Sequence, residues 1–240
     1  MKALILAAGM GTRLKEHTTN IPKCLVPVKG RPILEIQLDA LLANGITEVV
    51  LVTGYKSEKI VEFLGASTKF KDINFTLIEN KEYATSNSGY SFWLAREELR
   101  DKPYLHLNCD IIINSEVIAA LLKKPHQDVL SIDRGENAES MEKVILDEQN
   151  KIIAMEKYDL SVYSGKVVGL AKFSATTTNW ILGHLARYIN AGEKNQNCFG
   201  MLRHYVHSQD LYAFEITNFN VNEINTVAGL DKVHNEGNYI

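Results

Sequence analysis

The chain begins with an apolar run that leads directly into a turn of very small residues. Residues 2–6 are apolar enough for a strand buried on both faces, and residues 7–11 read AAGMG. A turn with so few side-chain atoms lets backbone N–H groups approach an anion closely. Arg13 and Lys23 follow, and both can bind phosphate oxygens through charge-assisted hydrogen bonds. The opening therefore predicts the first strand of an α/β sheet, with an anion-binding turn at its carboxyl end.

Strands and helices alternate through the rest of the first half of the chain. Apolar patterning predicts strands at residues 48–53, 74–78, 104–107 and 129–133, and helices at residues 33–42, 57–64, 90–99 and 115–122. Ser115 is the expected N-cap of the last helix. Because the connections are short, the pattern indicates the α/β class, with a Rossmann-like, mostly parallel sheet sandwiched by helices. Ligands of such sheets bind at the carboxyl ends of the strands, where the glycine turn and Asp110 both fall.

From about residue 136 the pattern becomes richer in strands. We expect a hairpin over residues 144–146 and 152–156, strands at 167–173, 212–216 and 219–223, and helices at 178–190, 197–207 and 226–235. No linker or repeat divides the chain. The expected organisation is a single domain over residues 1–240, with a core at about 1–135 and a β-rich C-terminal elaboration at about 136–240 that ends in a closing helix.

Composition places the chain among ordinary globular proteins, with 45% hydrophobic and 23% charged residues. A net charge of −3 argues against a nucleic-acid-binding surface. No apolar stretch approaches the ~18 residues that cross a membrane, and the apolar N-terminus lacks the cleavage site of a signal peptide. Cys24, Cys109 and Cys198 show no metal-binding spacing and are expected to be reduced thiols, which favours a cytoplasmic location.

Two well-known glycine motifs do not fit the turn. The dinucleotide fingerprint needs a glycine or alanine where the chain has Leu14, and the P-loop ends in Gly-Lys-Ser/Thr, which is absent. A plain strand-to-helix turn is the remaining alternative. The cations at Arg13 and Lys23 argue against it and favour a phosphate ligand.

The turn and its cations belong to a longer pattern. Residues 6–14 (LAAGMGTRL) and 22–28 (PKCLVPV) resemble the signature of the sugar-phosphate nucleotidyltransferase superfamily. Within it, residues 80–95 (NKEYATSNSGYSFWLA), 107–110 (LNCD), 168–174 (VGLAKFS) and 223–226 (EINT) are similar to the phosphocholine and phosphonate cytidylyltransferase branch. The resemblance extends over nearly the whole chain. It implies a nucleotide-binding core and an acceptor-binding elaboration.

The implied reaction is transfer of a nucleoside monophosphate, with CMP from CTP favoured, to a small phosphate or phosphonate with release of pyrophosphate. Such chemistry depends on positioning and charge neutralisation, so the expected catalytic residues are Arg13, toward the β- and γ-phosphates, and Lys23, toward the α-phosphate. The resemblance implies that the nucleotide is bound by Leu6, Ala7, Ala8, Gly9, Met10, Gly11, Thr12, Arg13, Lys23, Ser86, Asn87, Ser88, Gly89 and Asp110.

Three of these residues carry further expectations. Asn87 offers both a donor and an acceptor to a pyrimidine edge, although the sequence does not decide between cytosine and uracil. Ser86 and Ser88 are also suited to cap the following helix. Gly89 stands where the family has a bulkier residue, which predicts a locally wider pocket.

Mg²⁺ is the expected cofactor. Asp110 ends an apolar strand, where an unpaired buried carboxylate is costly, and a hard cation that also contacts phosphates would offset that cost. Capping of the next helix is the alternative role of Asp110. The resemblance adds Glu223 and Asn225, which strand alternation places on one face. Asn225 replaces the family's aspartate and brings no negative charge.

The acceptor site is less defined by the sequence. Lys143 and Lys157 match lysines that face the acceptor phosphate in the family, and ordinary exposed lysines are the alternative. A choline group needs an aromatic box, and no tryptophan lies near Met141 or Phe173, so a phosphonate or polyol phosphate fits at least as well.

Several alternatives remain open at this level. They are a sugar-1-phosphate uridylyl- or thymidylyltransferase, a molybdopterin guanylyltransferase-like enzyme, and a nucleotide-binding module without catalysis. The expected partners are the nucleoside triphosphate and the acceptor, without nucleic acid or membrane, and a homodimer is one assembly open to the chain.

Overall fold

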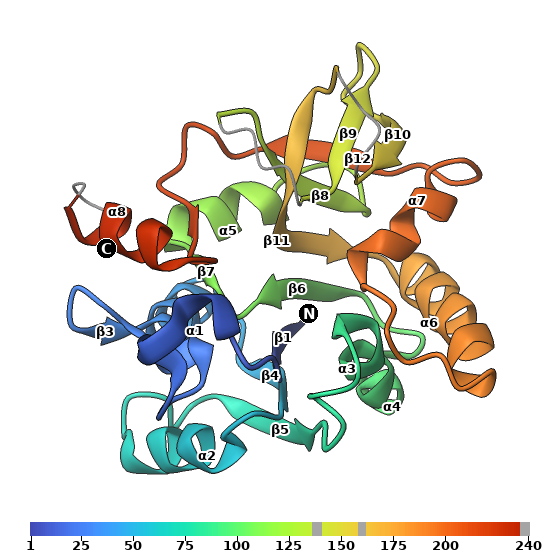
Figure 1. Ribbon diagram of the computed structural model, residues 1–240. Coiled ribbons are helices and arrows are strands. Elements are labelled where there is room, and N and C mark those ends of the chain that lie inside the picture. The colour runs from blue at the N-terminus through green and yellow to red at the C-terminus, as the bar shows by residue number, and fades with distance from the viewer. Residues whose placement is uncertain (136–140, 158–161, 236–240) are drawn as a thin grey trace.

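The computed structural model describes residues 1–135, 141–157 and 162–235, which build a nine-stranded sheet with helices on both faces (Figure 1). The main path of the sheet runs in the order β10 (Ile152–Glu156), β9 (Lys143–Leu146), β11 (Gly165–Phe173), β6 (Tyr104–Asn108), β1 (Lys2–Ala7), β4 (Glu48–Thr53) and β5 (Asn74–Glu79). Two further strands, β8 (Val129–Asp133) and β12 (Tyr212–Glu215), pair with each other, and β8 also pairs with β11.

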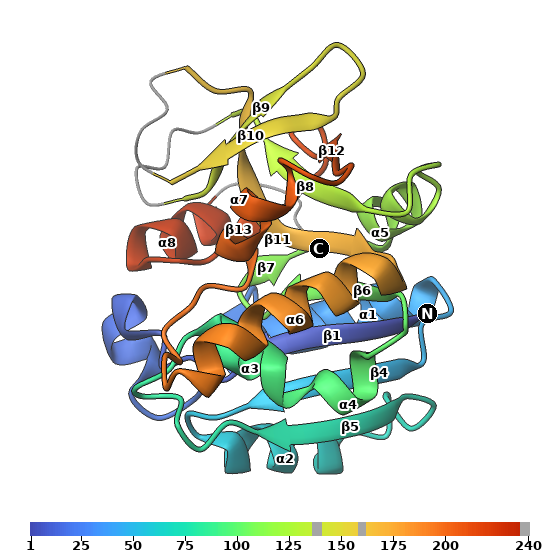
Figure 2. The same ribbon diagram turned by 90° about the vertical axis from the view of Figure 1, so that its right-hand side faces the viewer.

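The strand β1 lies inside the sheet and is buried on both faces. Its alternate residues Ala3 and Ile5 pack with α1 (Ile33–Ala43), α2 (Ser57–Ala66) and α5 (Ser115–Leu122). Leu4 and Leu6 pack on the other face with α3 (Ser88–Leu94), α4 (Arg96–Leu99) and α6 (Ala175–Asn190), which Figure 2 shows side by side. The continuous apolar run of β1 thus reflects burial between two helix layers.

The sheet divides into a parallel core and a mixed second part. Strands β6, β1, β4 and β5 are parallel, as predicted from the strand–helix alternation. The long strand β11 pairs antiparallel with β6, β8 and β9, and its register against β8 shifts between Val167 and Ala171. The predicted fold class, a Rossmann-like sheet sandwiched by helices with a β-rich C-terminal part, is confirmed.

Several helix ends differ from the predictions. Asn114, not Ser115, caps α5, because its side chain accepts a hydrogen bond from the Val117 N–H. The predicted helix at 90–99 is two helices separated at Ala95, and the predicted helix at 197–207 is a 3-10 turn followed by the short α7 (Leu202–Tyr205). The helix predicted at 178–190 begins earlier, at Ala175, because Ser174 caps it.

The C-terminal helix α8 (Val227–Asn235) packs against the N-terminal part of the chain. Leu230 and Val233 share a buried cluster with Leu14, Val26 and Ile112. Two small ribbons flank this cluster, β2 (Pro27–Val28) with β3 (Arg31–Pro32), and β7 (Ile111–Ile112) with β13 (Asn222–Glu223). Only the last two residues of the predicted strand at 219–223 are in β13. In the described residues, no helix combines the length and apolarity needed to cross a membrane.

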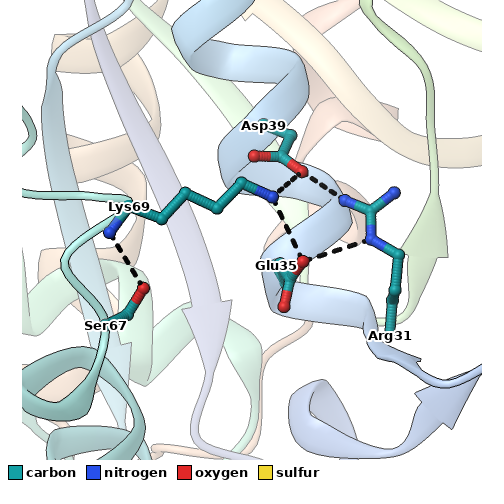
Figure 3. A network of polar contacts seen from close by, with 5 residues as sticks. All are labelled: Arg31, Glu35, Asp39, Ser67 and Lys69. Atoms are coloured by element: carbon teal, nitrogen blue, oxygen red, sulfur yellow. Dashed lines mark hydrogen bonds and ion pairs between the residues drawn. The ribbon is translucent and has the colours of Figure 1, made fainter.

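Figure 3 shows a charged cluster that ties α1 to the segment after α2. Glu35 and Asp39 lie one turn apart on α1 and both pair with Arg31 and Lys69; the Lys69 Nζ is 2.7 Å from the Asp39 Oδ2 and 3.2 Å from the Glu35 Oε1. Burial raises the pKa of Glu35, but hydrogen bonds from Lys69 and Arg31 outweigh this effect and lower it. The cluster fixes α1 against the loop at Ser67, whose Oγ accepts from the Lys69 N–H.

Candidate active site

The glycine turn and Asp110 follow two adjacent parallel strands. In the register of β1 and β6, Leu6 lies opposite Asn108, so both strands end at the same edge of the sheet. The turn after β6 is supported from α1, where the buried Gln37 donates to the Asn108 and Ile111 carbonyl oxygens, each at 2.8 Å. The predicted convergence of the glycine turn and Asp110 follows from this register.

Glu223 reaches the site through the pairing of β13 with β7. Glu223 lies opposite Ile111 in the register of these two strands, and the Ile224 N–H donates to the Asp110 carbonyl oxygen at 2.8 Å. The Glu223 Oε1 accepts a hydrogen bond from the Gly169 N–H at 3.1 Å. Burial, together with the carboxylate of Asp110, raises the pKa of Glu223 to about 7. Two carboxylates from distant parts of the chain are therefore held together in a partly buried site.

Arg13 and Lys23 converge on one side chain. The Asn225 Oδ1 accepts hydrogen bonds from an Arg13 terminal nitrogen at 2.8 Å and from the Lys23 Nζ at 3.1 Å. Lys23 also forms an ion pair with Asp110, with Nζ and Oδ2 2.6 Å apart. Asn225 lies beyond the end of β13, and its amide faces the two cations whereas Glu223 faces Gly169. Strand alternation does not relate the two residues, because Asn225 lies outside the strand, but both line the same cavity.

A cavity of about 350 Å³ opens beside the glycine turn. Of the residues predicted to bind a nucleotide, those that line it are Leu6, Ala8, Gly9, Gly11, Thr12, Arg13, Lys23, Ser86, Asn87, Ser88 and Asp110. Gly11 adopts a left-handed φ of 65°, and a Cβ there would lie 3.1 Å from the Lys23 Cβ, so the glycine permits the close approach of the lysine. Ala7 is buried in β1 and Met10 is exposed; neither lines the cavity.

The loop before α3 closes this cavity and is held by Asn80. The buried Asn80 Nδ2 donates to the Ser86 and Ser91 hydroxyls, each at 3.0 Å. Asn87 caps α3 by accepting from the Ser88 N–H, so the predicted capping role of Ser86 and Ser88 is wrong. The amide nitrogen of Asn87 donates to the Asn195 Oδ1 at 3.2 Å.

Gly89 does not widen the pocket. Its N–H donates to the Gln196 carbonyl oxygen at 2.8 Å, and an added Cβ would lie 2.6 Å from the same oxygen. The space that a side chain would fill is taken by the backbone of Gln196. The expectation of a locally wider pocket is therefore wrong, and Gly89 is outside the lining of the cavity.

A second cavity of about 350 Å³ meets the first at Arg13 and Asn225. Both are lined by Arg13, Asn108, Asp110, Asn197, Phe199 and Asn225. Lys157 and Glu223 line the second cavity but not the first, and Lys143 lines neither of these two cavities. Lys143 is buried, with its Nζ 4.9 Å from the ring centroid of Tyr163. A third cavity of about 540 Å³ continues past Glu223 toward Lys166.

Sequence reasoning missed several residues of the site. Asn80, Asn108 and Asn197 line the cavities but were not among the predicted site residues, and Lys166 also lies in the wall of the third cavity. Asn108 lies two residues before Asp110 at the end of an apolar strand, which is a detectable signal. Asn197 follows a segment without regular structure and leaves no such signal. Cys109 is buried, and burial raises the pKa of its thiol to about 12, so it is no nucleophile.

Asp110 and Glu223 have the chemistry of a hard-cation site. The Asp110 Oδ1 is buried and has no hydrogen-bond partner among the described residues, and the two carboxylates repel each other. No group of three or more His, Cys, Asp or Glu side chains gathers in the part of the chain that the structure describes. Mg²⁺ commonly takes one or two carboxylates and completes its shell with water and substrate phosphates, so the pair fits that ion.

Known proteins share both the sequence pattern and the fold. The family described as MobA-like NTP transferase domain matches residues 3–171. The choline-phosphate cytidylyltransferase of Streptococcus pneumoniae is 41% identical over 99 residues, which are 41% of each chain. The CMP-5'-(3-aminopropyl)phosphonate synthase of Streptomyces rubellomurinus is 36% identical over 134 residues, 56% of this chain and 21% of the relative. The chain thus spans less than half the length of these curated relatives.

A solved structure aligns over almost the full length. The CTP:phosphocholine cytidylyltransferase from Streptococcus pneumoniae superposes with a TM-score of 0.81 at 24% identity, over 98% of this chain and 97% of that chain. The superposition confirms the fold, and the relatives confirm the resemblance to the cytidylyltransferase branch. Because the family match extends over residues 3–171, this chain belongs to the MobA-like NTP transferase domain family.

Proposed function

We propose that this protein is a nucleotidyltransferase that transfers CMP from CTP to a small phosphate or phosphonate acceptor and releases pyrophosphate. One observation carries the proposal: Arg13 and Lys23 meet on Asn225 where two cavities join. The first cavity has the glycine turn that suits a triphosphate, and the second has Lys157 for an acceptor anion. The cytidylyltransferase names of the two relatives support CTP and a phosphate or phosphonate acceptor.

In the reaction, an acceptor oxygen attacks the α-phosphorus of CTP, and the bond from that phosphorus to the bridging oxygen of the β-phosphate breaks. No residue has to deprotonate the acceptor, since a phosphate with a second pKa of about 6 is mostly a dianion at neutral pH. The main barrier is the approach of two anions. Lys23, held by Asp110 and Asn225 where the cavities join, would neutralise the α-phosphate. Arg13, beside it, would stabilise the charge that develops on the leaving pyrophosphate.

We further propose Mg²⁺ as the cofactor, held by Asp110 and Glu223. A bound ion would supply charge neutralisation to the phosphates and remove the repulsion between the two carboxylates. Asn225 is occupied by hydrogen bonds from Arg13 and Lys23, so its role here is to orient these cations rather than to bind metal. The amide oxygen of Asn225 is enough to accept these two hydrogen bonds, so this role does not need the negative charge of the family's aspartate.

A quaternary ammonium acceptor is less supported than a smaller one. Aromatic boxes recognise such groups, and Phe199 is the only aromatic side chain among the described residues that line the second cavity. A phosphonate or polyol phosphate needs no aromatic box. Phosphocholine nevertheless belongs in the test, because a relative is named for it.

The test is pyrophosphate release from a grid of CTP, UTP, GTP and ATP against phosphocholine, aminoalkylphosphonates, polyol phosphates and sugar-1-phosphates, with Mg²⁺. We expect release with CTP and a small acceptor. Asp110→Asn should abolish it while the protein still binds CTP in calorimetry. Release only with UTP and a sugar phosphate would replace the proposal by a uridylyltransferase, and no release from any pair would refute catalysis.

A further inference from the structure

Asn108 lies at the junction of the two cavities. It ends β6 and lines both cavities, between the residues of the nucleotide side and those of the acceptor side. Its side chain lies over Gly169, where an added Cβ would come within 2.5 Å of the Asn108 Cβ. Gly169 is thus the residue type that leaves room for Asn108. The same Gly169 donates its N–H to Glu223, so Asn108 borders the carboxylate pair as well.

His106 lies behind Asn108, two residues earlier on the same face of β6. It has no exposed surface, and its Nε2 is 3.2 Å from the Asn108 Oδ1. Its ring packs against Phe199, with centroids 4.6 Å apart, and Phe199 in turn lines both cavities. The buried core therefore fixes the position of His106, and His106 contacts the one oxygen of the Asn108 amide.

The tautomer of His106 decides which way the amide points. Burial lowers the pKa of His106 to about 4, so the ring is neutral at neutral pH and carries one N–H. Its Nδ1 is buried and has no partner among the described residues. An unmet acceptor costs less than an unmet donor, so the N–H belongs on Nε2, where it donates to the Asn108 Oδ1. The Asn108 NH₂ group then lies over Gly169, which with Asn108 lines the second cavity.

We propose that Asn108 is a catalytic residue that donates its amide hydrogen to an oxygen of the phosphoryl group being transferred, and that His106 is the positioning residue that orients this amide. This inference rests on the proposed function. The transferred phosphoryl must lie where nucleotide and acceptor meet, which is where the cavities join. A neutral donor that is already oriented stabilises charge that develops there without reorganisation. Because the contact strengthens in the transition state, its loss should lower kcat more than it raises KM.

Asn108→Asp is the sharpest variant. It has nearly the same shape and still accepts from His106, but it replaces the donor by a carboxylate oxygen that repels phosphate. We expect kcat to fall about 100-fold, with the KM for CTP changed by less than about 3-fold. Asn108→Ser is the second variant, in case the added charge impairs folding, and its kcat should fall about 30-fold. Asn74→Asp, at the exposed start of β5, is the matched control and should behave as wild type.

The role of His106 is tested by rescue. His106→Leu removes the donor to the Asn108 Oδ1 and should lower kcat about 10-fold, because the amide can then rotate. His106→Gln can restore an N–H donor near the position of Nε2 and should recover most of that loss. A purely structural role would instead make kcat follow the melting temperature in both variants, without recovery by glutamine.

The two proposals can fail separately. Pyrophosphate release by the wild-type protein tests the proposed function, and the ratio of each variant to wild type tests Asn108. Wild-type turnover in Asn108→Asp, or a loss that lies entirely in the KM for CTP, would overturn the role given to Asn108. Equal activity of His106→Leu and His106→Gln would overturn the role given to His106.

Discussion

Lys23 is the residue on which the charges of the site depend most directly. Only 11% of its side chain is exposed, and it contacts both Asp110 and Asn225. Its ion pair with Asp110 lies in the lining of the cavity beside the glycine turn. In the proposed reaction, a lysine held in this way would be oriented before substrate arrives and would neutralise phosphate charge without a reorganisation cost.

At the residue scale, we expect Lys23→Met to lower kcat at least about 100-fold and to weaken CTP binding by no more than about 5-fold. Methionine keeps most of the buried apolar stem and removes the ammonium group with its contacts to Asp110 and Asn225. The measurement is steady-state pyrophosphate release, with CTP affinity from calorimetry. Lys71→Met, at an exposed lysine far along the chain from the turn, is the control. Turnover at the wild-type level in Lys23→Met would exclude Lys23 from catalysis.

At the element scale, α3 is joined to the segment 194–198 by a ladder of hydrogen bonds. The Asn87 N–H donates to the Lys194 carbonyl oxygen at 3.0 Å, and the Gly89 N–H to the Gln196 carbonyl oxygen at 2.8 Å. The Cys198 N–H donates to the Ser88 Oγ at 2.9 Å. Asn197 and Cys198 line the first cavity, beside the glycine turn. These hydrogen bonds therefore fix the position of the wall that the segment 194–198 contributes to that cavity.

Gly89→Ala should therefore displace the segment 194–198, which forms part of the wall of the first cavity. The new Cβ would come within 2.6 Å of the Gln196 carbonyl oxygen, so one of the two segments must move. We expect a loss of about 1–3 kcal/mol in the free energy of unfolding and weaker CTP binding. Gly183→Ala, inside α6 where a Cβ meets nothing within 4 Å, should instead raise stability by about 0.5–1 kcal/mol. Urea unfolding measures the free energy of unfolding of both variants. A Gly89→Ala protein as stable as wild type would contradict the predicted clash with Gln196.

Helices and strands were predictable where the apolar residues of a single segment repeat with a clear period. The strand β1 and the helices α1, α2 and α5 were expected because burial on one or two faces leaves a clear apolar period. Their ends were less predictable. Asn114 and Ser115 are neighbours that can both cap a helix, and only the position of the Val117 N–H selects Asn114. No glycine or proline marks the break at Ala95.

At the scale of the whole molecule, the site is assembled from segments far apart in the chain. The glycine turn, Lys23 and Asp110 were predicted because each lies in a recognisable motif or at the end of a strand. The contact of Asn225 with Arg13 spans 212 positions and depends on the packing of α8 against the N-terminus. Neither that packing nor the place of Asn197 in the cavity wall leaves a local sequence pattern, so sequence reasoning did not find them.

The two lysines predicted for the acceptor differ in their place in the molecule, and this difference is testable. Lys157 lines the second cavity with Arg13 and Glu223, whereas Lys143 is buried against Tyr163. We expect Lys157→Ala to raise the KM for the acceptor about 10-fold and to leave the KM for CTP unchanged, because one charge-assisted contact to the acceptor anion is lost. Lys143→Ala should lower the free energy of unfolding by about 1 kcal/mol and leave the acceptor KM within about 2-fold.

Kinetics with both substrates varied, together with urea unfolding of each variant, separate these outcomes. The opposite pattern, with the acceptor KM raised by Lys143→Ala and not by Lys157→Ala, would mean that the second cavity is not the acceptor site. The acceptor would then have to bind from the side of Tyr163. Equal changes in the KM of both substrates in Lys157→Ala would instead show that the lysine acts on the site as a whole, because a contact confined to the acceptor cannot weaken CTP binding.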